Sequence, residues 1–346
     1  MMTLEQRIKK YDLGNSLGSL EQLVDQFSQT WEDVQNINYG DEYLREIDNI
    51  VIAGMGGSAY SFYVVQSLFG DQLKVPLILS NGYGLPNFVN ERSLVIGSSY
   101  SGTTEETVSG AKEALKRGSR LTFISAGGKL KEIADENALM GYFFDPKHNP
   151  AQQPRMGQGY MLLGTIGILS KMGLIQVDGE DVINSIQGLR DSMDDLSRQA
   201  QELVDKFRQQ YLIYVGAEHL SGNIHIIRNQ TNETAKQFAM YALIPELNHH
   251  LMEGLLYPEK DKPYFVFFNS DHYSERIKKR FILTDEVVKK NEAQTKNISV
   301  GGETKMAEFM RLLAFGGFLT FYQAMDYGLD PAKIPWVDYF KEKLSA

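Results

Sequence analysis

Two short segments rich in glycine and hydroxyl side chains could together hold an anion. The first, "GMGGSA" at residues 54–59, follows the apolar run "NIVIAG", and its glycines let the backbone approach a ligand closely. The second, "SSYSGTTEETVSG" at 98–110, has two glutamates where negative charge suits the start of a helix. Hydroxyls and the N–H groups of a helix start can bind a phosphate monoester without a lysine. The predicted phosphate-binding residues are Gly57, Ser58, Ser99, Ser101 and Thr104.

A dinucleotide or a nucleoside triphosphate fits these segments less well. Residues 54–59 satisfy the loose dinucleotide pattern G-x-G-x-x-A. A dinucleotide site requires a carboxylate at the end of the next strand, about 20 residues on, where this chain has Ser80 and Asn81. No G-K-[ST] follows, so a Walker loop is excluded. Ordinary helix caps account for either segment alone, whereas two such segments after neighbouring strands favour phosphate binding.

Composition restricts the class of protein. The chain has 346 residues, 42% of them hydrophobic, which is enough for two α/β domains or one large one. It contains no cysteine, which excludes disulfides, thiolate metal sites and a cysteine nucleophile. The net charge of −9 argues against broad nucleic-acid binding. The start "MMTLEQRIKKYDL" lacks the apolar stretch of a secretory signal and no long apolar window occurs, so we expect a cytoplasmic protein that contacts no membrane.

Alternating strand-like and helix-like segments predict the fold class. The runs "NIVIAG", "VPLILS", "SLVIGSS" and "LTFISA" are separated by helix-like segments, which is typical of a parallel, doubly wound α/β sheet. A helix is expected over about 18–35 and a long helical region over about 160–208. The pattern restarts at "YLIYVGAEHL" and "YFVFFNSDHYSER". We therefore predict an N-terminal helical cover (1–40), a first subdomain (41–155), connecting helices (156–208) and a second subdomain with a C-terminal helical tail (209–346).

Further motifs resemble a known family. "GMGGSA" with "SYSGTTEET" resembles the sugar isomerase (SIS) domain. "PRMGQG" at 154–159, "RNQTNETAK" at 228–236, "PELNHH" at 245–250 and the terminal "DPAKIPWVDYFKEKL" narrow the resemblance to the bifunctional phosphoglucose/phosphomannose isomerases. This resemblance implies two SIS subdomains, each a flavodoxin-like αβα sandwich, and a metal-free aldose-ketose isomerase of hexose 6-phosphates. It also implies a homodimer with active sites at the subunit interface.

The resemblance also implies the catalytic residues. Glu233 matches the base that moves a proton between C2 and C1 through a cis-enediol. His249 matches a histidine that assists ring opening from the partner subunit, with the adjacent His250 as the alternative. Arg155 matches the arginine that stabilises the enediolate. Lys341 best matches a lysine that helps open the ring, and Lys343 competes for that role.

The sequence leaves several alternatives open. A zinc-dependent site is disfavoured because consecutive histidines diverge by about 100° on a helix, and the sequence has no H-x-H or H-x-x-x-H pair. The other histidines are expected to be structural or exposed: His148, His219, His225 and His272. "NHHL" and "DPAK" depart from the family pattern near the expected sugar site, so the choice between glucose and mannose epimers stays open. A non-catalytic sugar-phosphate-binding protein and an SIS isomerase or deaminase of another phosphosugar are the competing functions.

Overall fold

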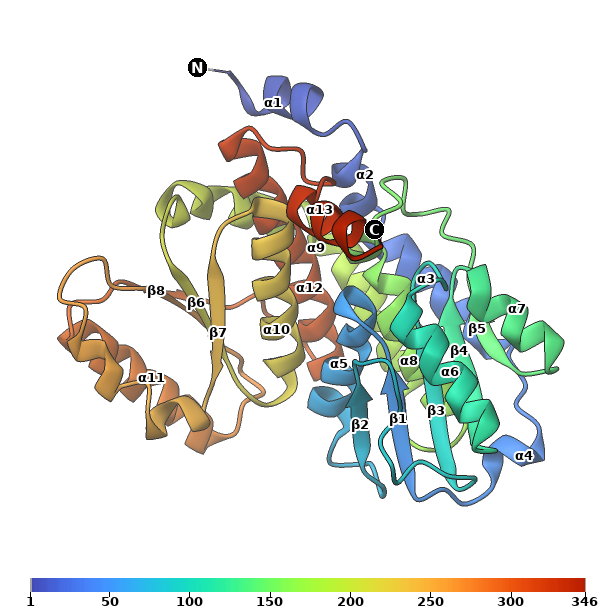
Figure 1. Ribbon diagram of the computed structural model, residues 1–346. Coiled ribbons are helices and arrows are strands. Elements are labelled where there is room, and N and C mark those ends of the chain that lie inside the picture. The colour runs from blue at the N-terminus through green and yellow to red at the C-terminus, as the bar shows by residue number, and fades with distance from the viewer. Residues whose placement is uncertain (1, 346) are drawn as a thin grey trace. The chain divides into compact units, whose positions relative to one another are not determined.

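A computed structural model describes residues 2–345 and shows two compact units, each with its own sheet (Figure 1). The first unit comprises residues 22–190. The second comprises the chain up to Glu21 and from Asp191 onward. Both sheets are entirely parallel, and the prediction of two α/β sheets of this kind is confirmed. The finer division into four segments stays a prediction.

The sheet of the first unit has the strand order β2-β1-β3-β4-β5. This is the flavodoxin-like order, in which a ligand binds where the strand order reverses, at the carboxyl ends of the first and third strands. β1 and β3 are buried along their whole length, which explains their continuous apolar sequence. The strands are β1 (Asn49–Ala53), β2 (Leu77–Ser80), β3 (Ser93–Ser98), β4 (Arg120–Ser125) and β5 (Gly141–Phe143).

Helices cover both faces of this sheet. α6 (Glu105–Lys116) and α7 (Gly128–Glu136) share an apolar core with one face of β1, β3 and β4. α8 (Gln158–Lys171) packs against β4 and β5. Two further helices, α3 (Leu23–Gln35) and α5 (Tyr60–Phe69), pack against α8. Gly164 of α8 permits this packing, because a Cβ there would lie 2.6 Å from Ile124 Cδ1. The remaining helices are α4 (Asp41–Leu44), η1 (Gly56–Ala59) and η2 (Pro154–Met156).

The sheet of the second unit repeats the first four positions of this topology, in the order β7-β6-β8-β9. Its strands are β6 (Leu212–Gly216), β7 (Ala239–Leu243), β8 (Tyr264–Phe268) and β9 (Thr295–Ile298). Its central helix is α12 (Lys305–Tyr327), which is buried along nearly its whole length and ends at Gly328 in the left-handed conformation (φ 68°). Gly316 of α12 lets α10 (Ser221–Gln230) approach closely, since a Cβ there would lie 2.5 Å from Ile227 Cγ1.

The other helices of the second unit lie mostly at its surface or in its turns. They are α1 (Leu4–Tyr11), α2 (Ser16–Glu21), η3 (Glu218–Leu220), η4 (Thr231–Ala235), η5 (Glu246–His249), η6 (Glu253–Leu256), α11 (Glu275–Lys290) and α13 (Pro335–Ser345). The long α9 (Gly179–Phe207) includes residues of both units. Within residues 2–345, no helix combines the length and apolar composition that crossing a membrane requires.

Candidate active site

The turn after β1 lies against the end of β3. Gly56 takes a left-handed conformation (φ 52°) at the start of η1. A Cβ at Gly54 would lie 2.9 Å from the carbonyl oxygen of Ser98, and one at Gly57 would lie 3.1 Å from Gln158 Nε2. The glycines of "GMGGSA" are therefore required partly by close packing, and the backbone of Gly57 lies beside the start of α8.

Ser58 ties the two predicted phosphate-binding segments together. Its Oγ accepts a hydrogen bond from the Tyr100 N–H (3.0 Å). Its carbonyl oxygen accepts one from the hydroxyl of Ser98 (2.7 Å). Ser58 is buried. The turns after β1 and β3 therefore form one polar unit at the carboxyl edge of the sheet.

The loop between β3 and α6 presents paired hydroxyls. Ser99 Oγ lies 2.9 Å from Thr104 Oγ1 and accepts a hydrogen bond from the Gly102 N–H. Ser101 Oγ, on the exposed side, lies 2.9 Å from Thr103 Oγ1. Since a hydroxyl can rotate to donate or accept, these pairs can redirect their protons toward phosphate oxygens at the N-terminus of α6.

Gly102 fixes the shape of this loop. Its φ is 72°, and a Cβ would lie 1.8 Å from the carbonyl oxygen of Gly127 in the turn after β4. The N–H of Leu130 donates to the Gly102 carbonyl oxygen (3.0 Å), and the N–H of Ala126 donates to that of Tyr100 (2.9 Å). The neighbouring βα turn thus holds the hydroxyl loop rigidly in place.

Arg155 reaches the same edge of the first unit. It lies in η2, is only 4% exposed, and donates from Nη1 to Gln153 Oε1 (3.2 Å). Its backbone nitrogen would be 3.9 Å from a Cβ at Gly57. Gln158, which the sequence pattern did not single out, donates to the Pro154 carbonyl oxygen (2.7 Å) and so closes this turn. The structure therefore places the backbone of Arg155 beside the Gly57 turn, and a role of its side chain at the phosphate site stays a prediction.

In the second unit, Glu233 lies in an unusual helical turn. The segment Thr231–Ala235 is a π-helix that continues α10, and Glu233 in it is half-buried. π-Helical turns are rare and are frequent at functional sites. The turn ends at Lys236, a non-glycine residue in the left-handed conformation (φ 53°).

The neighbours of Glu233 are held by hydrogen bonds that the sequence alone did not indicate. Asn232 Nδ2 donates to the carbonyl oxygens of Arg228 (2.8 Å) and Ala239 (2.9 Å), which joins the turn to β7. Thr231 Oγ1 lies 2.9 Å from the hydroxyl of the buried Tyr214. The polar run "RNQTNET" was the only signal of this arrangement, and it did not identify the partners.

The two candidate histidines differ in their contacts. His250 Nε2 lies 2.7 Å from Glu246 Oε1, whereas the ring of His249 is exposed and forms no hydrogen bond with any residue in the range 2–345. This difference favours His249 as the ring available to a ligand.

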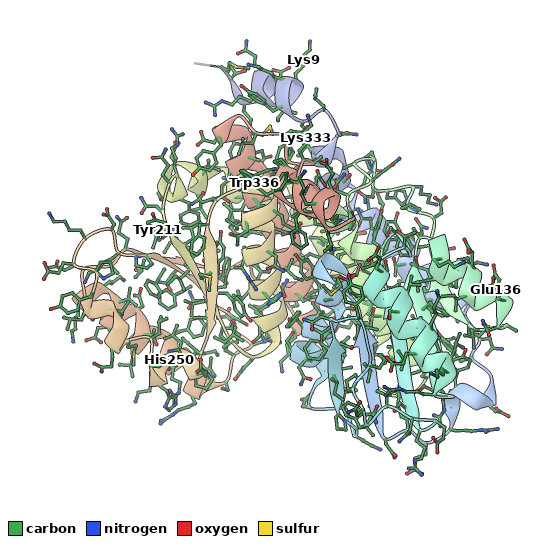
Figure 2. The ribbon with its side chains drawn as sticks, in the orientation of Figure 1. Lys9, Glu136, Tyr211, His250, Lys333 and Trp336 are labelled. Atoms are coloured by element: carbon green, nitrogen blue, oxygen red, sulfur yellow. The ribbon has the colours of Figure 1, made fainter. Side chains whose placement is uncertain are left out.

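The two candidate lysines lie on α13, and both are exposed. Lys343 Nζ lies 5.8 Å from the centre of the Tyr339 ring. The same helix exposes large apolar side chains, including Trp336 (Figure 2). The choice of Lys341 stays a prediction.

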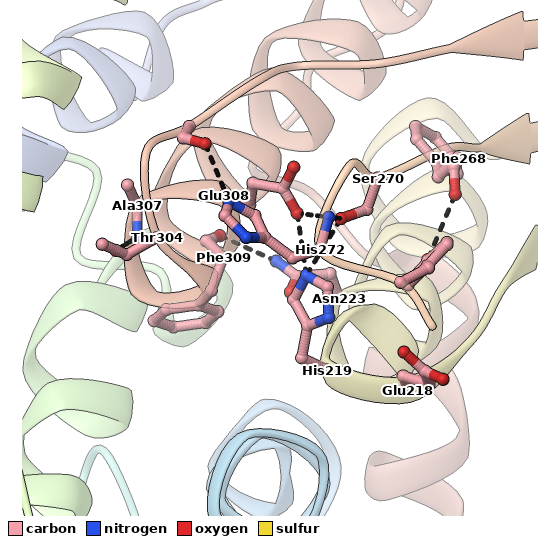
Figure 3. Close-up of polar contacts among 12 residues, drawn as sticks. Glu218, His219, Asn223, Phe268, Ser270, His272, Thr304, Ala307, Glu308 and Phe309 are labelled. Carbon is pink, nitrogen blue, oxygen red and sulfur yellow. Dashed lines mark hydrogen bonds and ion pairs between the residues drawn. The ribbon is translucent and has the colours of Figure 1, made fainter. Parts of the chain in front are cut away.

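The corresponding edge of the second sheet, at the ends of β6 and β8, is filled by side chains of the chain itself. Glu218, left-handed like Gly56 (φ 43°), accepts hydrogen bonds from the N–H (3.0 Å) and hydroxyl (2.6 Å) of Ser274 at the start of α11. Close by, the buried His219 and Ser270 both contact Glu308 of α12, with 2.7 Å from His219 Nε2 to Glu308 Oε2 (Figure 3). Two carboxylates therefore occupy this region.

Known proteins match both the second unit alone and nearly the whole chain. A family model for the bacterial phospho-glucose isomerase C-terminal SIS domain matches residues 196–344. A bifunctional phosphoglucose/phosphomannose isomerase of Caldicellulosiruptor bescii is 30% identical over 341 residues, covering 94% of this chain and 98% of the relative. The chain belongs to the bifunctional phosphoglucose/phosphomannose isomerase family. Another member, from Thermoplasma acidophilum, is 30% identical over 86% of this chain and 90% of its own length.

Solved structures share the fold of this family member. A hypothetical protein of Thermus thermophilus has a TM-score of 0.73 at 15% identity, covering 99% of this chain and 92% of its own. Glucosamine-6-phosphate deaminase of Thermotoga maritima has a TM-score of 0.66 at 16% identity, and the match covers 92% of this chain and 97% of the deaminase. Within residues 2–345, the structure brings no three histidine, aspartate or glutamate side chains together in a way that could hold a metal ion.

Proposed function

We propose that this protein interconverts glucose 6-phosphate, mannose 6-phosphate or both with fructose 6-phosphate through a cis-enediol intermediate. The observation that carries the proposal is the 30% identity to a bifunctional phosphoglucose/phosphomannose isomerase over nearly the full length of both chains. The hydroxyl cradle at the carboxyl edge of the first sheet suits the phosphate that these sugars share.

In this proposal the phosphate end of the sugar binds at Gly57 and Ser58 and at the hydroxyls of the β3–α6 loop. The phosphate lies far from the reacting carbons C1 and C2, and the binding energy at the phosphate holds these carbons in place for the reaction. Arg155 supplies a fixed positive charge for the enediolate oxygen.

The proton transfer is assigned to Glu233. His249 and Lys341 help to open the ring by moving a proton between the ring oxygen and the C1 hydroxyl. The Glu233 carboxylate takes the C2 proton of the open aldose, the C2–H electron pair becomes the C1–C2 double bond, and the C1 carbonyl electrons move to O1, where Arg155 stabilises the charge. The proton of the C2 hydroxyl then passes to O1. The protonated Glu233 returns its proton to C1, the double-bond electrons form this C–H bond, and C2 becomes the ketone of fructose 6-phosphate.

The assembly and the location belong to the same proposal. We assign a homodimer in which His249 reaches the active site of the partner subunit, because this ring lies exposed on its own unit. Exposed apolar side chains on α13 suit a covered surface: Trp336 (79% exposed), Phe340 (63%) and Leu344 (64%). A chain without cysteine suits the reducing cytoplasm.

A coupled assay tests the activity directly. Purified, chelator-treated protein is given glucose 6-phosphate or mannose 6-phosphate, and fructose 6-phosphate is followed. Glucosamine 6-phosphate serves as the third substrate, because a relative from Sulfolobus acidocaldarius, 28% identical over 64% of this chain, is a D-glucosamine-6-phosphate 4-epimerase. We expect turnover of at least one of the first two sugars. Measurable binding of both without turnover would overturn the proposal in favour of a binding protein.

A further inference from the structure

The residue that ends the Glu233 turn has an unusual backbone conformation. Lys236 has φ 53° and donates its N–H to the Thr231 carbonyl oxygen, which closes the π-helical turn. The left-handed conformation costs a non-glycine residue about 1–2 kcal/mol. α12 ends in the same conformation with Gly328, where a Cβ would lie 3.1 Å from the Tyr11 side chain.

The Lys236 side chain joins two segments of the second unit. Its half-buried ammonium donates to the carbonyl oxygen of Thr234 (3.1 Å), inside the Glu233 turn. It also donates to the carbonyl oxygen of Asp330 (2.8 Å), which lies 94 residues further along the chain. Hydrogen bonds from a charged donor are roughly twice as strong as neutral ones. One ammonium therefore bridges the turn of Glu233 and the connection between α12 and α13.

The bridged connection leads to the other predicted catalytic group of this unit. Asp330 is followed by a short turn in which its Oδ1 accepts the N–H of Ala332 (2.9 Å), and α13 then begins at Pro335. α13 carries Lys341. Because the ammonium holds one carbonyl oxygen on each side, it restrains the distance between the Glu233 turn and the start of this connection.

We propose that Lys236 is a positioning residue that holds the Glu233 turn and the segment leading to Lys341 at a fixed spacing. The proposal rests on the proposed isomerisation for its effect on rate. The bridge itself is a property of the second unit and can be tested without substrate. Because the phosphate-binding residues belong to the first unit, loss of the bridge is expected to lower kcat more than it raises KM.

The test compares three variants in the full-length protein. Lys236→Met keeps the length of the side chain and removes its charge, and Lys236→Arg keeps the charge. Lys290→Met is the control: Lys290 lies on α11 of the same unit, its side chain is 71% exposed, and its Nζ lies 2.6 Å from Glu286 Oε1. For each variant kcat and KM are measured, together with hydrogen–deuterium exchange of the peptides covering 231–237 and 329–335.

We expect Lys236→Met to lower kcat at least about tenfold with KM within about threefold, since small displacements of reacting groups are costly. Exchange should become faster in both peptides, Lys236→Arg should recover part of both effects, and Lys290→Met should match the wild type. Wild-type kcat or unchanged exchange in Lys236→Met would overturn the proposal. An inactive wild type would overturn the proposed function instead, and the exchange comparison would still decide whether Lys236 forms the bridge.

Discussion

Glu233 and the residues around it show how single side chains prepare a site. Asn232 and Thr231 form hydrogen bonds with the backbone of α10 and β7 and with Tyr214. These bonds hold the π-helical turn that carries Glu233. A carboxylate held in this way is suited to a proton transfer that needs a fixed distance.

His225, on the helix that leads into this turn, gives the stability a defined pH dependence. Burial, followed by the positive charge of Arg228, lowers the pKa of His225 to about 4. Below pH 6.5 the unfolded histidine binds a proton that the folded one does not, so the free energy of unfolding falls as the pH drops from 6.5 to 4. His225 changes the free energy of unfolding by at most about 1.4 kcal/mol per pH unit. Solvent on the exposed side of the ring reduces this contribution.

Denaturant unfolding of the wild type and His225→Gln at pH 4.5, 5.5 and 7 measures this dependence. The variant should lose less stability on acidification than the wild type does. Equal losses in both proteins would contradict the assignment of a neutral, partly buried His225.

At the scale of elements, the β3–α6 loop depends on its contact with the turn after β4. Gly102→Ala adds a Cβ that would lie 1.8 Å from a backbone oxygen. Gly118→Ala is the matched control, because Gly118 has nearly the same φ (70°) and nothing within 4 Å of the added Cβ. The control should cost about 1 kcal/mol of stability from the left-handed backbone alone.

We expect Gly102→Ala to lower the stability clearly more than Gly118→Ala does. It should also weaken the binding of inorganic phosphate at least about tenfold, because the hydroxyls of the β3–α6 loop lose their positions. Calorimetric titration with phosphate and thermal unfolding give the two quantities. Equal behaviour of the two variants would show that the loop does not depend on this packing.

A second element-level contact holds the turns of the second sheet to α12. His219 and Ser270 follow β6 and β8, and both contact Glu308, which is 2% exposed. Glu308→Gln leaves buried polar partners imperfectly matched, so we expect a loss of about 3 kcal/mol in the free energy of unfolding. Glu303→Gln, an exposed neighbour on the preceding turn, should change little. A small loss for Glu308→Gln in urea unfolding would contradict a structural role for this cluster.

The sequence predicts the elements of this fold better than it predicts their contacts. The apolar runs that become β1, β3, β6 and β8 were recognisable because central parallel strands are buried on both faces. β9, "TKNI", is a polar edge strand and was missed, as were β5 and β7. The helix expected over 18–35 is divided at Gln22 into α2 and α3.

In the candidate site too, the sequence predicts the segments involved better than the contacts between their residues. Glycines and hydroxyls after two strands predict a phosphate site, and the two turns that carry them do meet, because the carboxyl ends of neighbouring parallel strands lie at one edge. The hydrogen bonds that hold Glu233 and Arg155 were not predictable. Contacts such as that of Lys236 with Asp330 join residues far apart in the chain, and no local pattern specifies such a pair.

At the scale of the whole molecule, the proposed homodimer with shared active sites predicts complementation between inactive chains. In a dimer of Glu233→Gln with His249→Asn, one of the two sites would contain both native residues. Random mixing should therefore restore up to about a quarter of wild-type activity. Differently tagged chains show whether mixed dimers form. Mixed dimers that remain inactive would contradict a site shared between subunits.

The most direct test of the proposed chemistry follows the proton itself. Wild type, Glu233→Gln and the exposed control Glu253→Gln are incubated in D2O with glucose 6-phosphate or mannose 6-phosphate, and deuterium at C1 and C2 is followed by NMR. We predict incorporation by the wild type and the control, because an enediol exchanges its proton with solvent through the base. Glu233→Gln should incorporate deuterium at least about 1,000-fold more slowly. Isomerisation without any incorporation, or undiminished incorporation by Glu233→Gln, would contradict Glu233 as the base of an enediol mechanism.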